Sequence, residues 1–104
     1  MAALQRAVEL MPNSVEAKAR LADLALAIYQ NNPGNQAMYD LLVDLAAQLF
    51  AKDPESFDGL RVRGDLELFS GQPNEAIEYF ERANTVRPNN KYLMLPYVEA
   101  LFKA

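Results

Sequence analysis

Apolar residues recur along this chain at the spacing of helices that bury one face. Between residues 15 and 30 they stand at i, i+4, i+7, i+8 and i+11, and a similar period returns within residues 36–52 and 74–87. This pattern is typical of amphipathic α-helices. Proline, glycine and asparagine interrupt it at regular places. We therefore expect an all-α fold of about six antiparallel helices, near residues 2–11, 15–30, 36–52, 57–70, 74–87 and 90–103.

The segment 57–70 carries apolar residues on two opposite sides. One stripe comprises Phe57, Leu60, Gly64 and Leu68, and the other comprises Val62, Leu66 and Phe69. A helix that is apolar on two sides must be covered on both. We expect this segment to lie between neighbours rather than at the edge of the fold.

The chain also repeats itself. When Pro12, Pro54 and Pro88 are aligned, with spacings of 42 and 34 residues, several columns agree in residue type. The agreeing columns are Ala22, Gly64 and Val98; Asp23, Asp65 and Glu99; Leu26, Leu68 and Phe102; Leu4, Ala46 and Phe80; and Ala7, Leu49 and Ala83. Self-similarity at such a period indicates stacked helix–turn–helix units.

The unit Phe57–Asn90 resembles the tetratricopeptide repeat, a 34-residue helix–turn–helix family. The matching residues are the small residue Gly64, the A-x3-F pair Ala76 and Phe80, the later alanine Ala83, and the closing proline Pro88. Arg63 and Glu67 depart from the family, which prefers leucine and an aromatic residue there. The resemblance implies a right-handed α-α superhelix, a tetratricopeptide-like solenoid.

On this register the chain is one domain over residues 1–104. It divides into a partial repeat (1–14), an extended repeat (15–56), the best-matching repeat (57–90) and a second partial repeat (91–104). We expect a section of a longer array whose terminal helices lack polar caps. Uncovered apolar faces on such helices favour self-association.

The resemblance also implies a concave groove lined by the first helix of each unit. Its expected peptide-binding residues are Asp23, Leu26, Asp58, Arg61, Val62, Asp65, Phe69, Tyr92, Leu95, Glu99 and Phe102. Glu16, Ala19, Arg20, Ala27 and Leu68 share the same register. The apolar members ringed by acids would suit an amphipathic, mildly basic peptide. Leu26 and Leu68 have core packing as an equal alternative.

Composition narrows the chemistry. The chain has no cysteine and no histidine, and its net charge is −4. These features remove thiolate metal sites and the commonest general base, and they disfavour binding to a phosphate backbone. No apolar run is long enough to span a membrane, and the first residues form a poor signal peptide. We expect a soluble protein with no cofactor, metal, nucleic acid or membrane insertion, in the cytoplasm or, if a longer parent had a signal peptide, in an extracytoplasmic space.

The expected function is protein–protein interaction, as an adaptor or assembly scaffold, rather than catalysis. The alternative is a structural spacer array within a larger catalytic or secretion-related protein, with no ligand of its own. Asp23 and Asp65 could adjoin as a catalytic carboxylate pair, but no nucleophile, histidine or phosphate loop accompanies them. The Lys, Asn and Arg set that clamps chaperone tails in this family is replaced by Ala19, Asp23, Val62, Tyr92 and Pro96.

Overall fold

The computed structural model describes residues 15–104, and every regular element in that part of the chain is an α-helix. The helices are α2 (Val15–Asn31), α3 (Gln36–Lys52), α4 (Phe57–Phe69), α5 (Pro73–Val86) and α6 (Lys91–Lys103). The predicted all-α fold is confirmed, and each helix begins and ends within one residue of its expected bounds. The helix expected over residues 2–11 lies outside the described residues.

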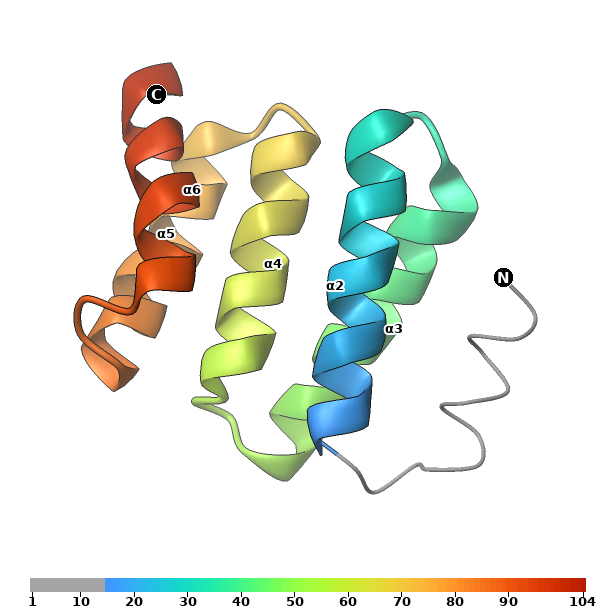
Figure 1. Cartoon of the computed structure of the whole chain (residues 1–104), viewed down its shortest axis with the longest axis horizontal. Coiled ribbons are helices and arrows are strands. Elements are labelled where there is room, and N and C mark those ends of the chain that lie inside the picture. The colour runs from blue at the N-terminus through green and yellow to red at the C-terminus, as the bar shows by residue number, and fades with distance from the viewer. Residues whose placement is uncertain (1–14) are drawn as a thin grey trace.

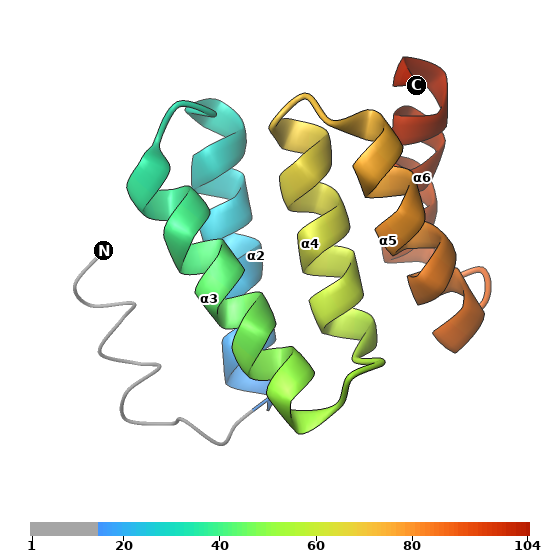
Figure 2. The same ribbon diagram turned by 180° about the vertical axis from the view of Figure 1, so that it is seen from behind.

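The helices pack as two hairpins followed by a single helix (Figure 1). The α2–α3 and α4–α5 hairpins stand side by side, and α6 continues the row beyond α4. Figures 1 and 2 show two layers, with α2, α4 and α6 on one side and α3 and α5 on the other. The side formed by α2, α4 and α6 is called the front face below.

Short capping interactions set the ends of the helices. The side chains of Asn35, Ser56 and Asn90 accept hydrogen bonds from backbone N–H groups at the starts of α3, α4 and α6, at 3.2, 3.1 and 3.0 Å. These bonds satisfy donors that a helix start leaves free. Between α4 and α5, Gly71 has a φ of +81° and Pro73 stands in the first turn of α5. Both features agree with the turn predicted there.

Helix α4 is the centre of the fold and contacts each of the other four described helices. Val62 and Leu66 belong to one buried cluster together with α2 and α3. Phe57, Leu60 and Leu68 belong to a second cluster together with α5 and α6. The expectation that α4 is covered on two sides is confirmed.

The two residues of α4 that depart from the repeat pattern satisfy each other. Glu67 is buried, and its carboxylate lies 3.2 Å from the Arg63 guanidinium and accepts a 3.4 Å hydrogen bond from the Tyr39 hydroxyl. Arg63 also donates to the hydroxyl of Tyr79 at 3.5 Å and lies over its ring. A polar network thus links α3, α4 and α5 at this position.

Helix α6 runs without interruption from Lys91 through Pro96 to Lys103. Pro96 therefore neither delays the start of the helix nor interrupts it. Proline removes one helical hydrogen bond, the one to the carbonyl of Tyr92. Because Tyr92 is in the exposed first turn, water can hydrate that carbonyl.

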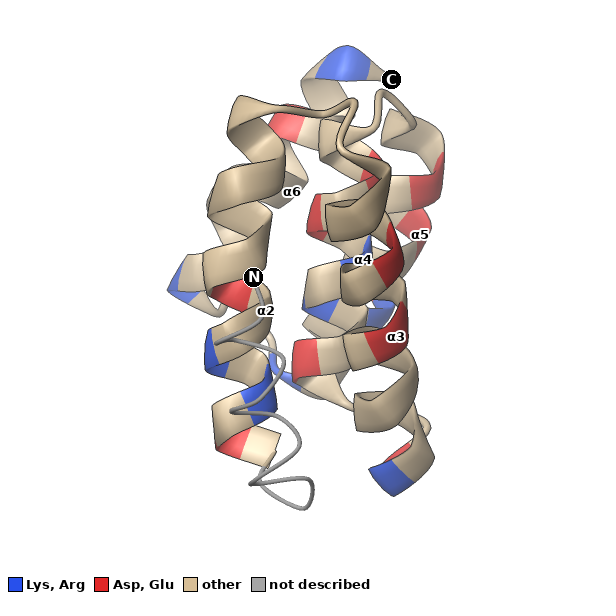
Figure 3. Cartoon of the chain, turned by 90° about the vertical axis from the view of Figure 1, so that its right-hand side faces the viewer, with Lys and Arg blue, Asp and Glu red and all other residues tan. Residues whose placement is uncertain are grey.

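Charged residues are spread over both layers of the fold (Figure 3). On the outer side of α3, Asp40 and Asp44 are exposed and accept hydrogen bonds from Gln36 and Gln48. None of the helices between residues 15 and 104 is long and apolar enough to cross a membrane.

Candidate binding cleft

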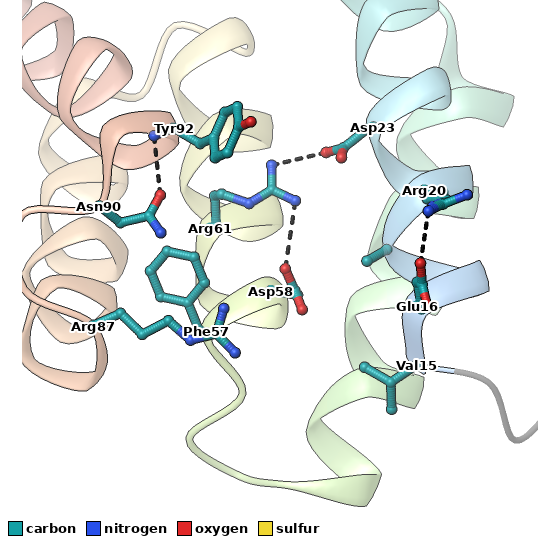
Figure 4. A pocket seen from close by; sticks show the side chains of 11 residues that line it. Val15, Glu16, Arg20, Asp23, Phe57, Asp58, Arg61, Arg87, Asn90 and Tyr92 are labelled. Atoms are coloured by element: carbon teal, nitrogen blue, oxygen red, sulfur yellow. Dashed lines mark hydrogen bonds and ion pairs between the residues drawn. The ribbon is translucent and has the colours of Figure 1, made fainter.

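A cleft of about 720 Å³ opens on the front face between α2, α4 and the start of α6. It is called the front cleft below. This volume lies within the range of small-ligand and side-chain sites in proteins. Its walls are formed by Val15, Glu16, Ala19, Arg20, Asp23, Phe57, Asp58, Arg61, Arg87, Asn90 and Tyr92 (Figure 4).

The two long walls come from corresponding turns of α2 and α4. Val15 and Phe57 are the first residues of their helices, and Glu16 and Asp58 are the second. Ala19 and Arg61 follow one turn later. Each pair is separated by 42 residues, the spacing of Pro12 and Pro54. The front cleft is therefore lined by equivalent positions of two successive units.

Arg61 is the centre of an ionic network at the back of the cleft. Its guanidinium lies 2.8 Å from the Asp23 carboxylate of α2, and 3.7 Å from the carboxylates of Asp58 and Asp65 on its own helix. The Arg61 side chain is only 11% exposed. Figure 4 shows it between Asp23 and Asp58. The ion pair with Asp23 joins the two hairpins across the front face.

Asp65 lies one turn beyond Arg61 and is nearly buried, with 9% of its surface exposed. Among residues 15–104, no group donates a hydrogen bond to its Oδ1 atom. Burial raises the pKa of the Asp65 carboxyl from 3.8 to about 7; Arg61 opposes the rise, while Asp23 and Glu99 add to it. At neutral pH this group therefore exchanges between its acid and carboxylate forms.

The rim of the cleft combines aromatic and cationic groups. The Arg87 guanidinium lies 4.8 Å from the centre of the Phe57 ring, a cation–π arrangement. Tyr92 is 70% exposed, and the Lys91 ammonium lies 5.1 Å from its ring centre. Arg20 and Glu16 form an exposed ion pair at 2.6 Å. An exposed aromatic ring beside a cleft is a suitable contact for a partner's side chain.

The structure divides the expected groove residues into five groups. Asp23, Asp58, Arg61 and Tyr92 line the cleft. Asp65 and Glu99 do not line it; Asp65 lies 3.7 Å from Arg61 of the cleft wall, and Glu99 helps to raise the pKa of Asp65. Leu26 and Val62 are buried, Phe69 is half-buried against the core, and Leu95 and Phe102 are exposed outside the cleft.

Two of these placements correct the sequence interpretation. Leu26 is 5% exposed and Val62 is fully buried, and both pack in the cluster shared by α2, α3 and α4. Neither side chain can contact a ligand on the front face. The register assigned them to the groove, but the close approach of α2 and α4 turns these positions into the contact between the hairpins. Leu68 is likewise a core residue.

The expected groove also omitted four residues that line the cleft, namely Val15, Phe57, Arg87 and Asn90. The first two begin α2 and α4, and the others belong to the turn before α6. For Val15 and Phe57, the proline alignment could have indicated the equivalence, because each stands three residues after an aligned proline.

Within residues 15–104, no group of three or more acidic side chains is arranged to hold a metal ion. Fold and cleft together define the class of the molecule as an all-α stack of helical hairpins with a mixed ionic and aromatic cleft. Comparison of the chain with models of known families, with curated proteins and with solved structures gives no match. The tetratricopeptide resemblance therefore stays a prediction from the sequence.

Proposed function

We propose that the chain is a protein-interaction module of the tetratricopeptide class, which binds a peptide segment of a partner protein in the front cleft. The observation that carries the proposal is the lining of the cleft by equivalent positions of α2 and α4, completed by the start of α6. A surface built in this way by repetition is the kind that helical repeat proteins use for binding.

The chemistry of the walls supports a peptide rather than a small apolar ligand. Tyr92 offers exposed ring surface, while Asp23, Asp58 and Arg61 offer charged donors and acceptors. Peptide recognition combines a few anchoring side chains with polar groups that fix orientation. The cleft has both kinds of group within one space.

Selection from a library of short random peptides, displayed on phage, tests the proposal. We expect selected peptides to bind the parent chain and to bind the Tyr92→Ala variant about 5- to 30-fold more weakly, the effect of losing about 1–2 kcal/mol at an interface. Leu95→Ala is the matched control, because Leu95 is a large residue of the same helix that is 80% exposed outside the cleft. Equal binding by both variants, or the absence of any selected peptide, would contradict the proposal and favour the spacer alternative.

We infer a second contact at the outer side of α6, with another copy of the chain as its partner. Val98, Leu101 and Phe102 are 48%, 54% and 85% exposed there. By the proline alignment, Val98 corresponds to Ala22 and Gly64, which are buried in their own units. The positions exposed on the outer side of α6 thus correspond to positions that are covered by a following helix in the two preceding units.

A further inference from the structure

Three carboxylates from two helices surround the Arg61 guanidinium on the front face, and a fourth carboxylate, from a third helix, acts on one of them. Asp23 comes from α2, Asp58 and Asp65 come from α4, and Glu99 comes from α6. Arg61 is the cation among them. With every group ionised, the three carboxylates around Arg61 leave an excess of two negative charges.

Arg61 does not satisfy the four carboxylates equally. Its one short contact, 2.8 Å, goes to Asp23, while Asp58 and Asp65 remain at 3.7 Å. Glu99 pairs with Lys103 at 3.4 Å on the exposed side of α6. Asp65 is therefore the least satisfied member, because its Oδ1 atom is buried without a donor.

A buried carboxylate oxygen without a donor is costly, and such groups in native proteins call for a physical reason. Asp65 does not itself line the front cleft, but its carboxylate lies 3.7 Å from the guanidinium of Arg61, which does, and Asp23, another lining residue, helps to raise its pKa. A donor that enters the cleft above Arg61 would meet Asp65 between α4 and α6. The free protein lacks that donor in its own described side chains.

We propose that the front cleft, at Asp65, binds the cationic side chain of an arginine or lysine in the bound peptide. Guanidinium and ammonium groups are donors only, and they match a site that offers acceptors in excess. Arg61 already shows that a guanidinium fits between these carboxylates. The proposal rests on the proposed function, and it names the chemistry that the peptide must bring.

Binding of the cation and ionisation of Asp65 are coupled. The charged groups that act on Asp65 are Asp23 from α2, Arg61 from α4 and Glu99 from α6. With the pKa of Asp65 at about 7, the carboxylate is the minor form at about pH 6 and the major form at about pH 8. A bound cation favours the carboxylate, so its affinity rises about tenfold across this interval.

The first experiment tests the cationic group of the side chain alone, without a peptide. Methylguanidinium chloride and methylammonium chloride are titrated into the labelled full chain, with sodium chloride at equal ionic strength as the reference. We expect a saturable change in the side-chain carboxyl resonance of Asp65 with at least one organic cation and none with sodium. In Asp65→Asn the saturable changes in backbone amides of α4 and α6 disappear, while Asp40→Asn, which removes an exposed acid on α3, keeps them. Linear changes identical to those with sodium would overturn the proposal.

The second experiment uses the selected peptides and separates this proposal from the proposed function. We expect a basic residue at one fixed position, and a loss of affinity of about tenfold or more when citrulline replaces arginine or norleucine replaces lysine there. The same loss appears with unmodified peptide on Asp65→Asn. Peptides that bind through Tyr92 without a basic residue would overturn the cation site and leave the proposed function standing. If no peptide binds, the proposed function fails, and the cation cannot come from a peptide. The titration with the small cations then still decides whether the cation site exists.

Discussion

Gly64 of α4 lies directly against the Phe80 ring of α5, and adding one methyl group there tests the packing directly. A Cβ atom at this position would lie 2.3, 2.5 and 2.9 Å from three atoms of the Phe80 ring. Carbon atoms in contact normally stay about 3.5 Å apart or more, so the ring or the helix must move by about 1.2 Å. Phe80 is fully buried and packs against Tyr97 of α6, with ring centres 5.9 Å apart. The displacement therefore meets a second packed group.

The expected magnitude follows from two opposing effects. Overpacking of a core costs about 1–3 kcal/mol. Replacing glycine by alanine inside a helix stabilises the folded state by about 1 kcal/mol through helix propensity. We expect Gly64→Ala to lower the free energy of unfolding by about 0–2 kcal/mol, and the bulkier Gly64→Leu to lower it further. For a domain of this size each kcal/mol moves the thermal midpoint by about 4–8 °C.

Urea unfolding followed by circular dichroism measures the change, and a double-mutant cycle with Phe80→Leu assigns its cause. In the Phe80→Leu background the ring atoms that obstruct the methyl group are absent, so Gly64→Ala should be neutral or stabilising, with a coupling of about 1 kcal/mol or more. Gly34→Ala is the matched control, because its nearest neighbour is a side-chain oxygen at 3.8 Å in an exposed turn. The packing argument is refuted if Gly64→Ala stabilises the chain by about 1 kcal/mol in both backgrounds, as propensity alone would require.

Three further outcomes are expected. Asn35→Ala removes the side-chain acceptor at the start of α3 and should cost about 1 kcal/mol in urea unfolding, whereas an unchanged midpoint would mean that the cap is not formed. Because the pKa of Asp65 is raised in the folded state, its contribution to stability is fully present below about pH 4 and is lost as the pH rises through about 7. Asp65→Asn should therefore gain stability relative to the parent between these values, and parallel pH profiles of the two proteins would contradict the assignment. The parent chain should self-associate in sedimentation equilibrium, and Leu101→Glu together with Phe102→Glu should abolish the association; a parent that stays monomeric at its highest concentration would refute the second contact on α6.

The gain in stability expected for Asp65→Asn and the loss of cation binding expected for the same variant belong together. A group that binds a partner is often kept at a cost to the fold. If Asp65 were only a structural residue, its replacement would not lower the affinity for the peptide while it stabilised the chain. Measuring both quantities on one variant therefore distinguishes a binding residue from a poorly packed one.

The bounds of α2 to α6 and the double burial of α4 were determined by the sequence alone. Local causes fix these features: the helical period, the capping residues Asn35, Ser56 and Asn90, and the breakers Gly71 and Pro73 act within a few residues of one another. The burial of both apolar stripes on α4 could be predicted without knowledge of its neighbours, because a helix that is apolar on two sides must be covered on both, whichever elements cover it.

Only the tertiary structure decided which front-face residues are free to bind. Leu26 and Val62 occupy the same register as groove residues, yet the approach of α2 to α4 buries both. The same approach places Arg61 across the gap to Asp23 and leaves Asp65 enclosed without a donor for Oδ1. Distances between residues some 40 positions apart depend on how the hairpins pack, and no local pattern encodes them. The sequence could therefore name the acids of the front face, while their burial and the site that they form had to come from the fold.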